Sequence, residues 1–371
     1  MSVGLTSERA ELGRSVRGFI SRYMPMSAVR RSMAALKGFD PEVWRQLTLQ
    51  LALPGIAVPE AHGGSGYGYA DLAVVFEEFG RGLIPLPFFS TTALALPALL
   101  AAEDETASNE YAPQLAGGSK IATLAWMEDG EDRGCGVQTT ARPIQGGWRV
   151  EGNKSYVLDA SAADLIFTTA KTSNGLSLFA VAATAPGVSR TPLPTFDQTR
   201  PLGRIAFQDV PARLIGEDGA GRQILSSALD RAAALLAAEM VGGAEACLDM
   251  SIEYAKARKQ FGRPIGSFQA IKHKCAEVLV EVEGARAAAY YAAWSADDSQ
   301  RELPVAACIA KASASEAFFR AAAENVQIHA GIGATWEHDA HLYLKRAKTS
   351  YILLGDPSYH RQRLADRIGL S

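Results

Sequence analysis

The chain has 371 residues, of which 48% are hydrophobic and 21% charged, and its formal net charge is −3 at pH 7. These values are typical of a soluble globular protein of two or three domains. The small negative charge and the absence of any run of five basic residues argue against a nucleic-acid partner. The cysteines stand singly, with no Cys-x-x-Cys pair, so we expect core thiols in a reducing compartment: Cys135, Cys247, Cys275 and Cys308.

The apolar stretches of the chain do not predict a membrane protein. Residues 82–102 are uncharged and nearly long enough to cross a bilayer, but Pro85, Pro87 and Pro97 divide them into short pieces. The first twenty residues carry Glu and Arg at helical spacing and lack the apolar core of a signal peptide. We therefore expect a cytoplasmic protein without a membrane span.

The first part of the chain, residues 7–116, has a helical pattern. Apolar residues recur three and four positions apart, as at Trp44, Leu47 and Leu51. The glycine-rich loop at residues 59–66 either turns the chain between helices or approaches a phosphate. No Lys-Ser or Lys-Thr follows it, which excludes a nucleotide P-loop.

The second part, residues 120–218, alternates apolar and polar residues with a period of two. At least six short runs are bounded by turn residues, and this number favours a small barrel or sandwich between helical domains. The predicted strands are residues 121–126, 147–152, 155–158, 165–170, 176–182 and 203–210.

The third part, from residue 220 onward, is helical again. Leu229, Leu236 and Met240 keep helical spacing in an Ala-rich context that allows close helix packing. Further helices are expected at about residues 268–296 and 304–330, which together predict a four-helix bundle.

The stretch 254–273 joins two of these helices through an unusual segment. We expect Arg258 and Phe261, three positions apart, to share a helix face before Gly262 interrupts it. An arginine beside free backbone amides can hold a diphosphate. A helix C-cap with a solvated cation near the helix dipole is the alternative.

The amino-acid sequence of this stretch resembles the flavin-binding segment of acyl-CoA dehydrogenases. The matching residues are Tyr254-x-x-x-Arg258-x-Gln260-Phe261-Gly262-Arg263-Pro264-Ile265 and Phe268-Gln269-Ala270-Ile271-Lys272-His273. The resemblance implies that Arg258, Gln260 and Phe261 contact the FAD of a neighbouring subunit. It also implies that Ile265, Phe268 and Gln269 help to hold this cofactor.

A second motif, Gln327-Ile328-His329-Ala330-Gly331-Ile332-Gly333, supports the same resemblance. In the family the matching Gln and glycine hold the adenine half of FAD across a subunit interface, which assigns Gln327, Gly331 and Gly333 to the cofactor. Ala330 stands where the first member of a Gly-Gly pair is usual. Residues 44–66 and 76–81 resemble the amino-terminal helical domain, where they shape the acyl-CoA pocket.

The resemblance implies an α+β fold of the acyl-CoA dehydrogenase type. Its expected parts are an N-terminal helical domain at 1–118, a middle β-barrel or sandwich at 119–218 and a C-terminal four-helix bundle at 219–371. Tyr156-Val157-Leu158 replaces the Trp-Ile-Thr tripeptide that touches the flavin in the family, so an aromatic is kept at Tyr156 and a hydroxyl is lost.

The general base of the family has no counterpart at its usual positions. Alignment on Gly355 places Leu354 where most members have Glu, and the position used by a minority falls on Ala232. Two other carboxylates are candidates for the base: Glu239 and Asp356. The structural alternatives are a buried pair with an arginine for Glu239, and a turn or cap for Asp356.

Three functional hypotheses follow. The first is an FAD-dependent acyl-CoA dehydrogenase of lipid metabolism, working in a dimer of dimers with a related subunit that supplies Glu. Its partners would be a bulky or sterol-derived acyl-CoA thioester and an electron-transfer flavoprotein or similar acceptor. The others are a flavin monooxygenase or oxidase on this fold and a catalytically silent structural subunit. His338, Asp339 and His341 lack the spacing of a metal site, and no metal is expected.

Overall fold

The computed structural model describes residues 6–130 and 136–370. The chain forms two compact units. One comprises Met1–Val29, Gly68–Ile84 and Asp230–Ser371, and the other comprises Arg30–Tyr67 and Pro85–Leu229. The expected boundaries near residues 118 and 218 stay a prediction.

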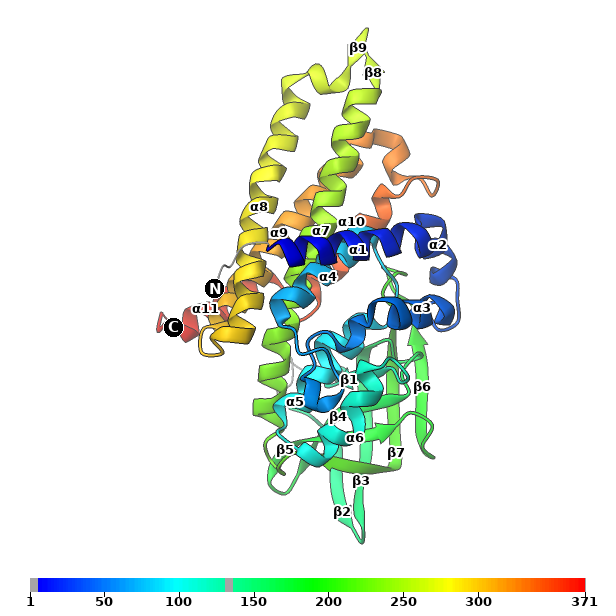
Figure 1. Ribbon diagram of the computed structural model, residues 1–371, viewed down its shortest axis with the longest axis vertical. Helices are drawn as coiled ribbons and strands as arrows, with labels where there is room; N and C mark the ends of the chain where they lie inside the picture. The colour runs from blue at the N-terminus through cyan, green and yellow to red at the C-terminus, as the bar shows by residue number, and fades with distance from the viewer. Residues whose placement is uncertain (1–5, 131–135, 371) are drawn as a thin grey trace. The chain divides into compact units, whose positions relative to one another are not determined.

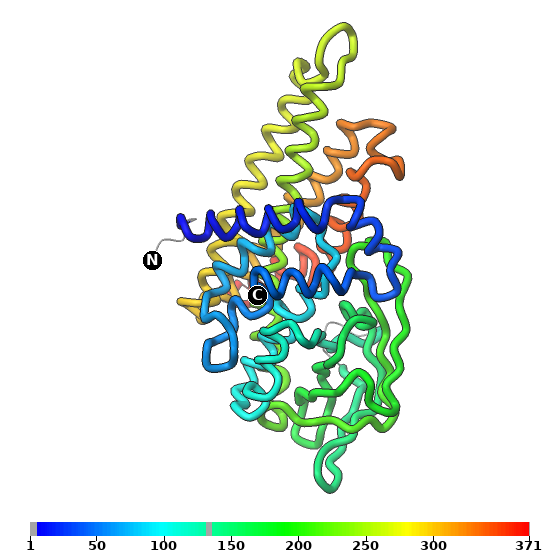
Figure 2. Tube along the Cα trace, turned by 45° about the vertical axis from the view of Figure 1, so that its right-hand side comes forward, coloured from blue at the N-terminus to red at the C-terminus, as the bar shows by residue number. Residues whose placement is uncertain are grey.

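The first unit is helical. The helices α7 and α8 run side by side and are joined at one tip by the β8–β9 hairpin (Figure 1). The trace in Figure 2 shows the same pair from another side. The elements are α1 (Ser7–Tyr23), α4 (Tyr69–Gly82), α7 (Gly221–Ala257, from Asp230 onward in this unit), β8 (Lys259–Gln260), β9 (Arg263–Pro264), η4 (Ile265–Ser267), α8 (Gln269–Asp298), α9 (Leu303–His329), η5 (Ala330–Ala334), α10 (Ala340–Ile352) and α11 (Pro357–Arg367); α2 (Met26–Met33) begins in this unit.

Two glycines bring α4 and α7 into unusually close contact. A Cβ atom added to Gly80 would lie 1.8 Å from the carbonyl oxygen of Glu239, and one added to Gly242 would lie 1.8 Å from that of Glu77. A side chain at either position would push the helices apart. The two glycines therefore allow the backbone of α4 at Glu77 and the backbone of α7 at Glu239 to lie in contact with the opposite helix.

The second unit contains short helices and a sheet of seven strands. Five of the strands, in the order β4–β2–β3–β7–β5, close into a ring because β5 pairs again with β4. The elements are α3 (Pro41–Leu51), η1 (Leu53–Gly55), η2 (Glu60–His62), the π-helix η3 (Phe89–Ala95), α5 (Leu96–Ala101), α6 (Glu105–Ala116), β1 (Ala122–Ala125), β2 (Thr140–Ile144), β3 (Gly147–Leu158), β4 (Leu165–Thr172), β5 (Gly175–Ala182), β6 (Val188–Leu193) and β7 (Leu202–Ile215).

The predicted strands differ from the observed ones at β3, β2 and β6. The runs 147–152 and 155–158 are a single strand, β3, whose pairing with β7 shifts register twice. Such bulges place extra residues on one strand and break the alternation on which the prediction rested. The strands β2 and β6 were not predicted; both are largely exposed, so their apolar pattern is weak.

The sheet unit contains a cluster of buried apolar side chains. Val150, Ile166, Phe179, Ile205 and Phe207 are 0–1% exposed and form part of one core cluster. In the part of the chain that the structure describes, no helix is long and apolar enough to cross a membrane.

The cysteine prediction is confirmed at two positions. Cys247 and Cys308 are buried, and burial raises the pKa of both thiols. Cys275 is only half-buried, and Cys135 lies outside the described residues.

Candidate functional site

The segment after α7 is a hairpin and not a continued helix. The helix ends at Ala257, and Lys259 and Gln260 pair with Pro264 and Arg263. The two residues between the strands, Phe261 and Gly262, have φ values of 51° and 78°, as a two-residue hairpin with both central residues left-handed requires. The expectation that Arg258 and Phe261 share a helix face is therefore wrong.

The hairpin presents its side chains to solvent in the single chain. Phe261 is 90% exposed and meets Phe268 edge-to-face, with ring centroids 6.1 Å apart. The guanidinium of Arg263 lies 4.2 Å from the centroid of Phe268. Arg258 and Gln260 are exposed as well. Donors and aromatic faces of this kind suit a ligand or a second subunit.

The second motif lies at the same end of the helical unit. Tyr254, at the end of α7, stacks on His329, the last residue of α9, with ring centroids 4.2 Å apart. Gln327 is exposed, and a Cβ atom at Gly331 would meet nothing within 4 Å. The structure thus brings the two predicted flavin motifs together. Of the remaining predicted residues, Gln269 is exposed, Ile265 is half-buried, and Gly333 packs on His329.

Ala330 takes a conformation that favours glycine. Its φ and ψ are 54° and −141°, directly after α9. Only glycine reaches this region without strain from Cβ. Alanine in place of the first glycine of the usual Gly-Gly pair therefore strains the backbone and also reduces the space available to a ligand.

Tyr156 lies in the second register shift of β3, with φ of 57° and 47% exposure. The bulge turns this side chain away from the regular alternation of the strand. Its predicted contact with a flavin stays a prediction.

Glu239 is engaged in a buried ion pair. Arg346, on α10, donates from Nη1 to Oε1 of Glu239 at 2.8 Å, and the side chains are 2% and 5% exposed. This is the structural alternative that the sequence left open for Glu239. Burial and pairing hold the carboxylate in a fixed place within the helical unit.

Asp356 caps a helix. Its Oδ1 accepts a hydrogen bond from the backbone N–H of Tyr359 at 2.8 Å, in the first turn of α11. Leu354 precedes it in a left-handed conformation, and Ala232 is fully buried on α7. The hydrocarbon side chains of Leu354 and Ala232 cannot accept a proton.

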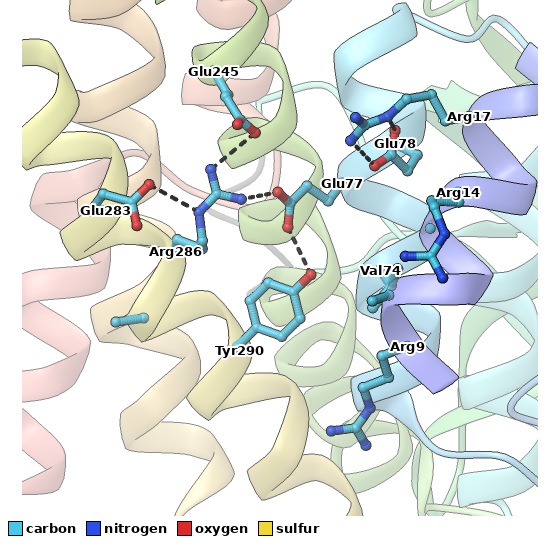
Figure 3. Close-up of a pocket in the computed structure, with 13 residues that line it drawn as sticks. Arg9, Arg14, Arg17, Val74, Glu77, Glu78, Glu245, Glu283, Arg286 and Tyr290 are labelled. Atoms are coloured by element: carbon cyan, nitrogen blue, oxygen red, sulfur yellow. Dashed lines mark hydrogen bonds and ion pairs between the residues drawn. The ribbon is translucent and has the colours of Figure 1, made fainter. Parts of the chain in front are cut away.

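A charged cavity, which the sequence did not reveal, lies within the helical unit (Figure 3). Its volume is about 620 Å³. Arg286 forms ion pairs with Glu77, Glu245 and Glu283, and the Tyr290 hydroxyl donates to Glu77 at 2.8 Å. Burial raises the pKa of Glu77, although Arg286 and Tyr290 act in the opposite direction. The network ties α8 to α4 and α7.

The histidines whose spacing argued against a metal site, His338 and His341, make local contacts. His338 stacks on His329 with centroids 4.3 Å apart, and His341 stacks on Trp336 at 5.1 Å. Nδ1 of His338 accepts from the backbone N–H of Ala340. These contacts account for their positions at the start of α10.

Comparison with known proteins assigns the family. A model of the acyl-CoA dehydrogenase N-terminal domain matches residues 6–119, and a model of the C-terminal domain matches residues 219–369. The chain belongs to the acyl-CoA dehydrogenase family. Acyl-CoA dehydrogenase IpdE2 of Mycobacterium tuberculosis is 36% identical over 97% of this chain and 97% of its own length.

Solved structures agree with this assignment. A Tcur3481-Tcur3483 steroid ACAD variant is 33% identical, covers 99% of both chains and gives a TM-score of 0.88. The ChsE4-ChsE5 complex from Mycobacterium tuberculosis is 27% identical, covers 100% of both chains and gives 0.91. The predicted order of helical, β and helical domains is confirmed, and the chain is an acyl-CoA dehydrogenase-type flavoprotein oxidoreductase.

Proposed function

We propose that the chain takes part in the FAD-dependent α,β-dehydrogenation of a CoA thioester, as a subunit that depends on a base from another chain. The observation that carries this proposal is the chemistry of two positions: Leu354 and Ala232 are apolar. The remaining candidates have other tasks, since Glu239 pairs with Arg346 and Asp356 caps α11. A proton acceptor at the α-carbon must then come from elsewhere.

The residues at the tip of the helical unit fit a flavin dinucleotide. Arg258 supplies a guanidinium for the diphosphate, Phe261 supplies an exposed ring, and Gly331 leaves space for a close backbone approach. FAD bound there would supply the acceptor for the β-hydrogen, which leaves as hydride. The residues Gln260, Ile265, Phe268, Gln269, Gln327, Gly333 and Tyr156 are proposed to complete the cofactor site.

Two similar solved structures support a heteromeric assembly with a Glu-bearing homologue. They are a Tcur3481-Tcur3483 steroid ACAD and a ChsE4-ChsE5 complex. We infer from them a dimer-of-dimers assembly and a bulky, sterol-derived acyl group. An electron-transfer flavoprotein or similar acceptor would reoxidise the flavin.

Anaerobic flavin bleaching tests the proposal. We expect the chain expressed alone to remain oxidised on addition of a steroid-side-chain CoA thioester. Co-expression with the Glu-bearing homologue of the same organism should produce a complex that bleaches. Bleaching by the chain alone would contradict the need for a second base, and an assembly that binds flavin without bleaching would favour a silent structural subunit. Oxygen consumption with substrate hydroxylation would favour a monooxygenase.

A variant pair tests the flavin site itself. Arg258→Gln should lower the bound flavin per chain several-fold, because a charged contact to the diphosphate is lost. Lys256→Gln is the matched control, since this exposed lysine lies two residues before Arg258, in the last turn of α7, and forms an ion pair with Glu253. Equal flavin content in the two variants would remove Arg258 from the site.

A further inference from the structure

We infer that Lys311 and His360 are positioning residues that hold the Leu354–Gly355 turn in one conformation, and that this turn directs side chain 354 toward the acyl group. The inference rests on the proposed function, because it concerns the same reaction. It adds two residues that neither the motifs nor the family resemblance singled out.

The turn has an unusual backbone. Leu354 has φ of 60° and Gly355 has φ of 108°, and Leu353 separates them from the end of α10 at Ile352. A left-handed conformation is costly for leucine, and such residues persist where their surroundings hold them in place. A Cβ atom at Gly355 would lie 2.3 Å from Cδ1 of Tyr359, so the chain also passes closely over α11 here.

Lys311 holds one side of the turn. This lysine on α9 is 0% exposed, and its Nζ donates to the carbonyl oxygens of Gly355 at 3.0 Å and Tyr351 at 3.4 Å. Nζ also donates to Oγ of Ser315 at 3.0 Å. The carbonyl of Tyr351 belongs to the last turn of α10, where helical acceptors lack partners and the helix dipole favours a cation.

His360 holds the other side. Its Nε2 donates to the carbonyl oxygen of Leu354 at 3.1 Å, and the residue is 1% exposed on α11. The start of α11 is itself fixed by the cap from Asp356. Residues from α9, α10 and α11 thus meet at one short turn, and together they determine the direction of the Cα–Cβ bond at position 354.

We expect the turn to keep the same backbone conformation whichever side chain stands at position 354, because Lys311 and His360 contact backbone carbonyls of the turn. Leucine there can shape the space for the acyl group but cannot take a proton. Glutamate at the same position would be held by the same backbone contacts. Misplacing such a carboxylate by about 1 Å would lower its rate of proton transfer by about 10²-fold.

Installing a base provides the experiment. Leu354→Glu is made in the flavin-containing assembly and mixed anaerobically with butyryl-CoA, octanoyl-CoA and a steroid-side-chain CoA thioester. We expect faster bleaching than in the Leu354 parent with at least one of these probes. Adding Lys311→Met should lower the saturating bleaching rate by about 10²-fold with little change in the half-saturating concentration. Lys348→Met, which alters an exposed lysine of α10, should change neither value.

A second pair of variants covers the case in which the buried Lys311→Met chain fails to fold. In the Leu354→Glu background, His360→Gln keeps an N–H donor near the Leu354 carbonyl, whereas His360→Leu removes it. We expect the rate to be retained in the first and lost in the second. Equal rates in this pair, or in Lys311→Met and its control, would overturn the positioning role.

The flavin spectrum separates this inference from the proposed function. If Leu354→Glu binds flavin and its spectrum shifts on adding thioester, yet bleaching does not increase, then the turn does not direct position 354 and the inference fails alone. If the assembly holds no flavin or shows no thioester-induced shift, the proposed function fails and the inference with it.

Discussion

The guanidinium of Arg346 and the carboxylate of Glu239 lie 2.8 Å apart in the interior of the helical unit, with 2% and 5% of the side chains exposed. Because the pair joins α10 to α7, its loss should lower the stability of the whole helical unit. This ion pair is the structural alternative that the sequence offered for Glu239.

Removal of Arg346 should strongly destabilise the chain. Arg346→Met removes the buried ion pair with Glu239, and we expect the free energy of unfolding to fall by about 3–5 kcal/mol. Urea unfolding followed by circular dichroism measures the change. The control is Arg361→Met, which breaks an exposed pair with Glu316 and should cost less than about 1 kcal/mol. Similar losses in both variants would contradict the role assigned to burial.

Ala330→Gly should stabilise the chain. The φ of 54° and ψ of −141° at Ala330 strain any residue with a Cβ atom, so glycine should raise the free energy of unfolding by about 1 kcal/mol. Ala334→Gly, at the end of the same short helix and without positive φ, should lower it by about 0.5–1 kcal/mol. Thermal unfolding of the two variants gives the comparison, and a destabilised Ala330→Gly would show that the backbone there is relaxed.

Glu128 should make the sheet unit sensitive to acid. Burial acts to raise its pKa, but Lys154 at 2.7 Å and the Thr139 hydroxyl at 2.6 Å outweigh burial and hold the pKa below its usual range. A lowered pKa in the folded state contributes stability above the unfolded value of about 4.3. This contribution is lost as pH falls through the folded value. The stability difference between the parent and Glu128→Gln should therefore shrink between pH 6 and acid pH; a constant difference would exclude the linkage.

Tyr290 should lower the pKa of Glu77. Burial raises this pKa, and the hydrogen bond from the Tyr290 hydroxyl opposes the rise by stabilising the charged form. Tyr290→Phe should therefore raise the pKa of Glu77 further, as measured by NMR titration of its carboxyl carbon. Because the folded pKa is raised, the contribution of Glu77 to stability is present below the unfolded value of about 4.3 and decreases as pH rises through the folded value. Tyr291→Phe, whose hydroxyl bonds Glu302 instead, should leave the Glu77 titration unchanged.

Local patterns predicted much of the helical structure and failed where the backbone departs from them. The helix near residues 268–296 was expected from periodicity and is observed as α8. The Phe261-Gly262 turn was missed, because it needs left-handed backbone at both positions and Asn-Gly or Asp-Gly is its usual signal. Lys311 had a detectable signal, since it stands between two alanines and is the only charged residue from Leu303 to Ser315, but no local rule says what a buried lysine contacts.

The sequence by itself determined the family and the order of helical and β parts. These properties follow from motifs and from periodicities that extend over a few residues. Tertiary structure alone decided the partners of the buried charges. Glu239 and Arg346 are 107 residues apart in the chain, and Lys311 and Gly355 are 44 apart. The partner of a desolvated charge is set by which helices pack together, and that depends on the whole fold.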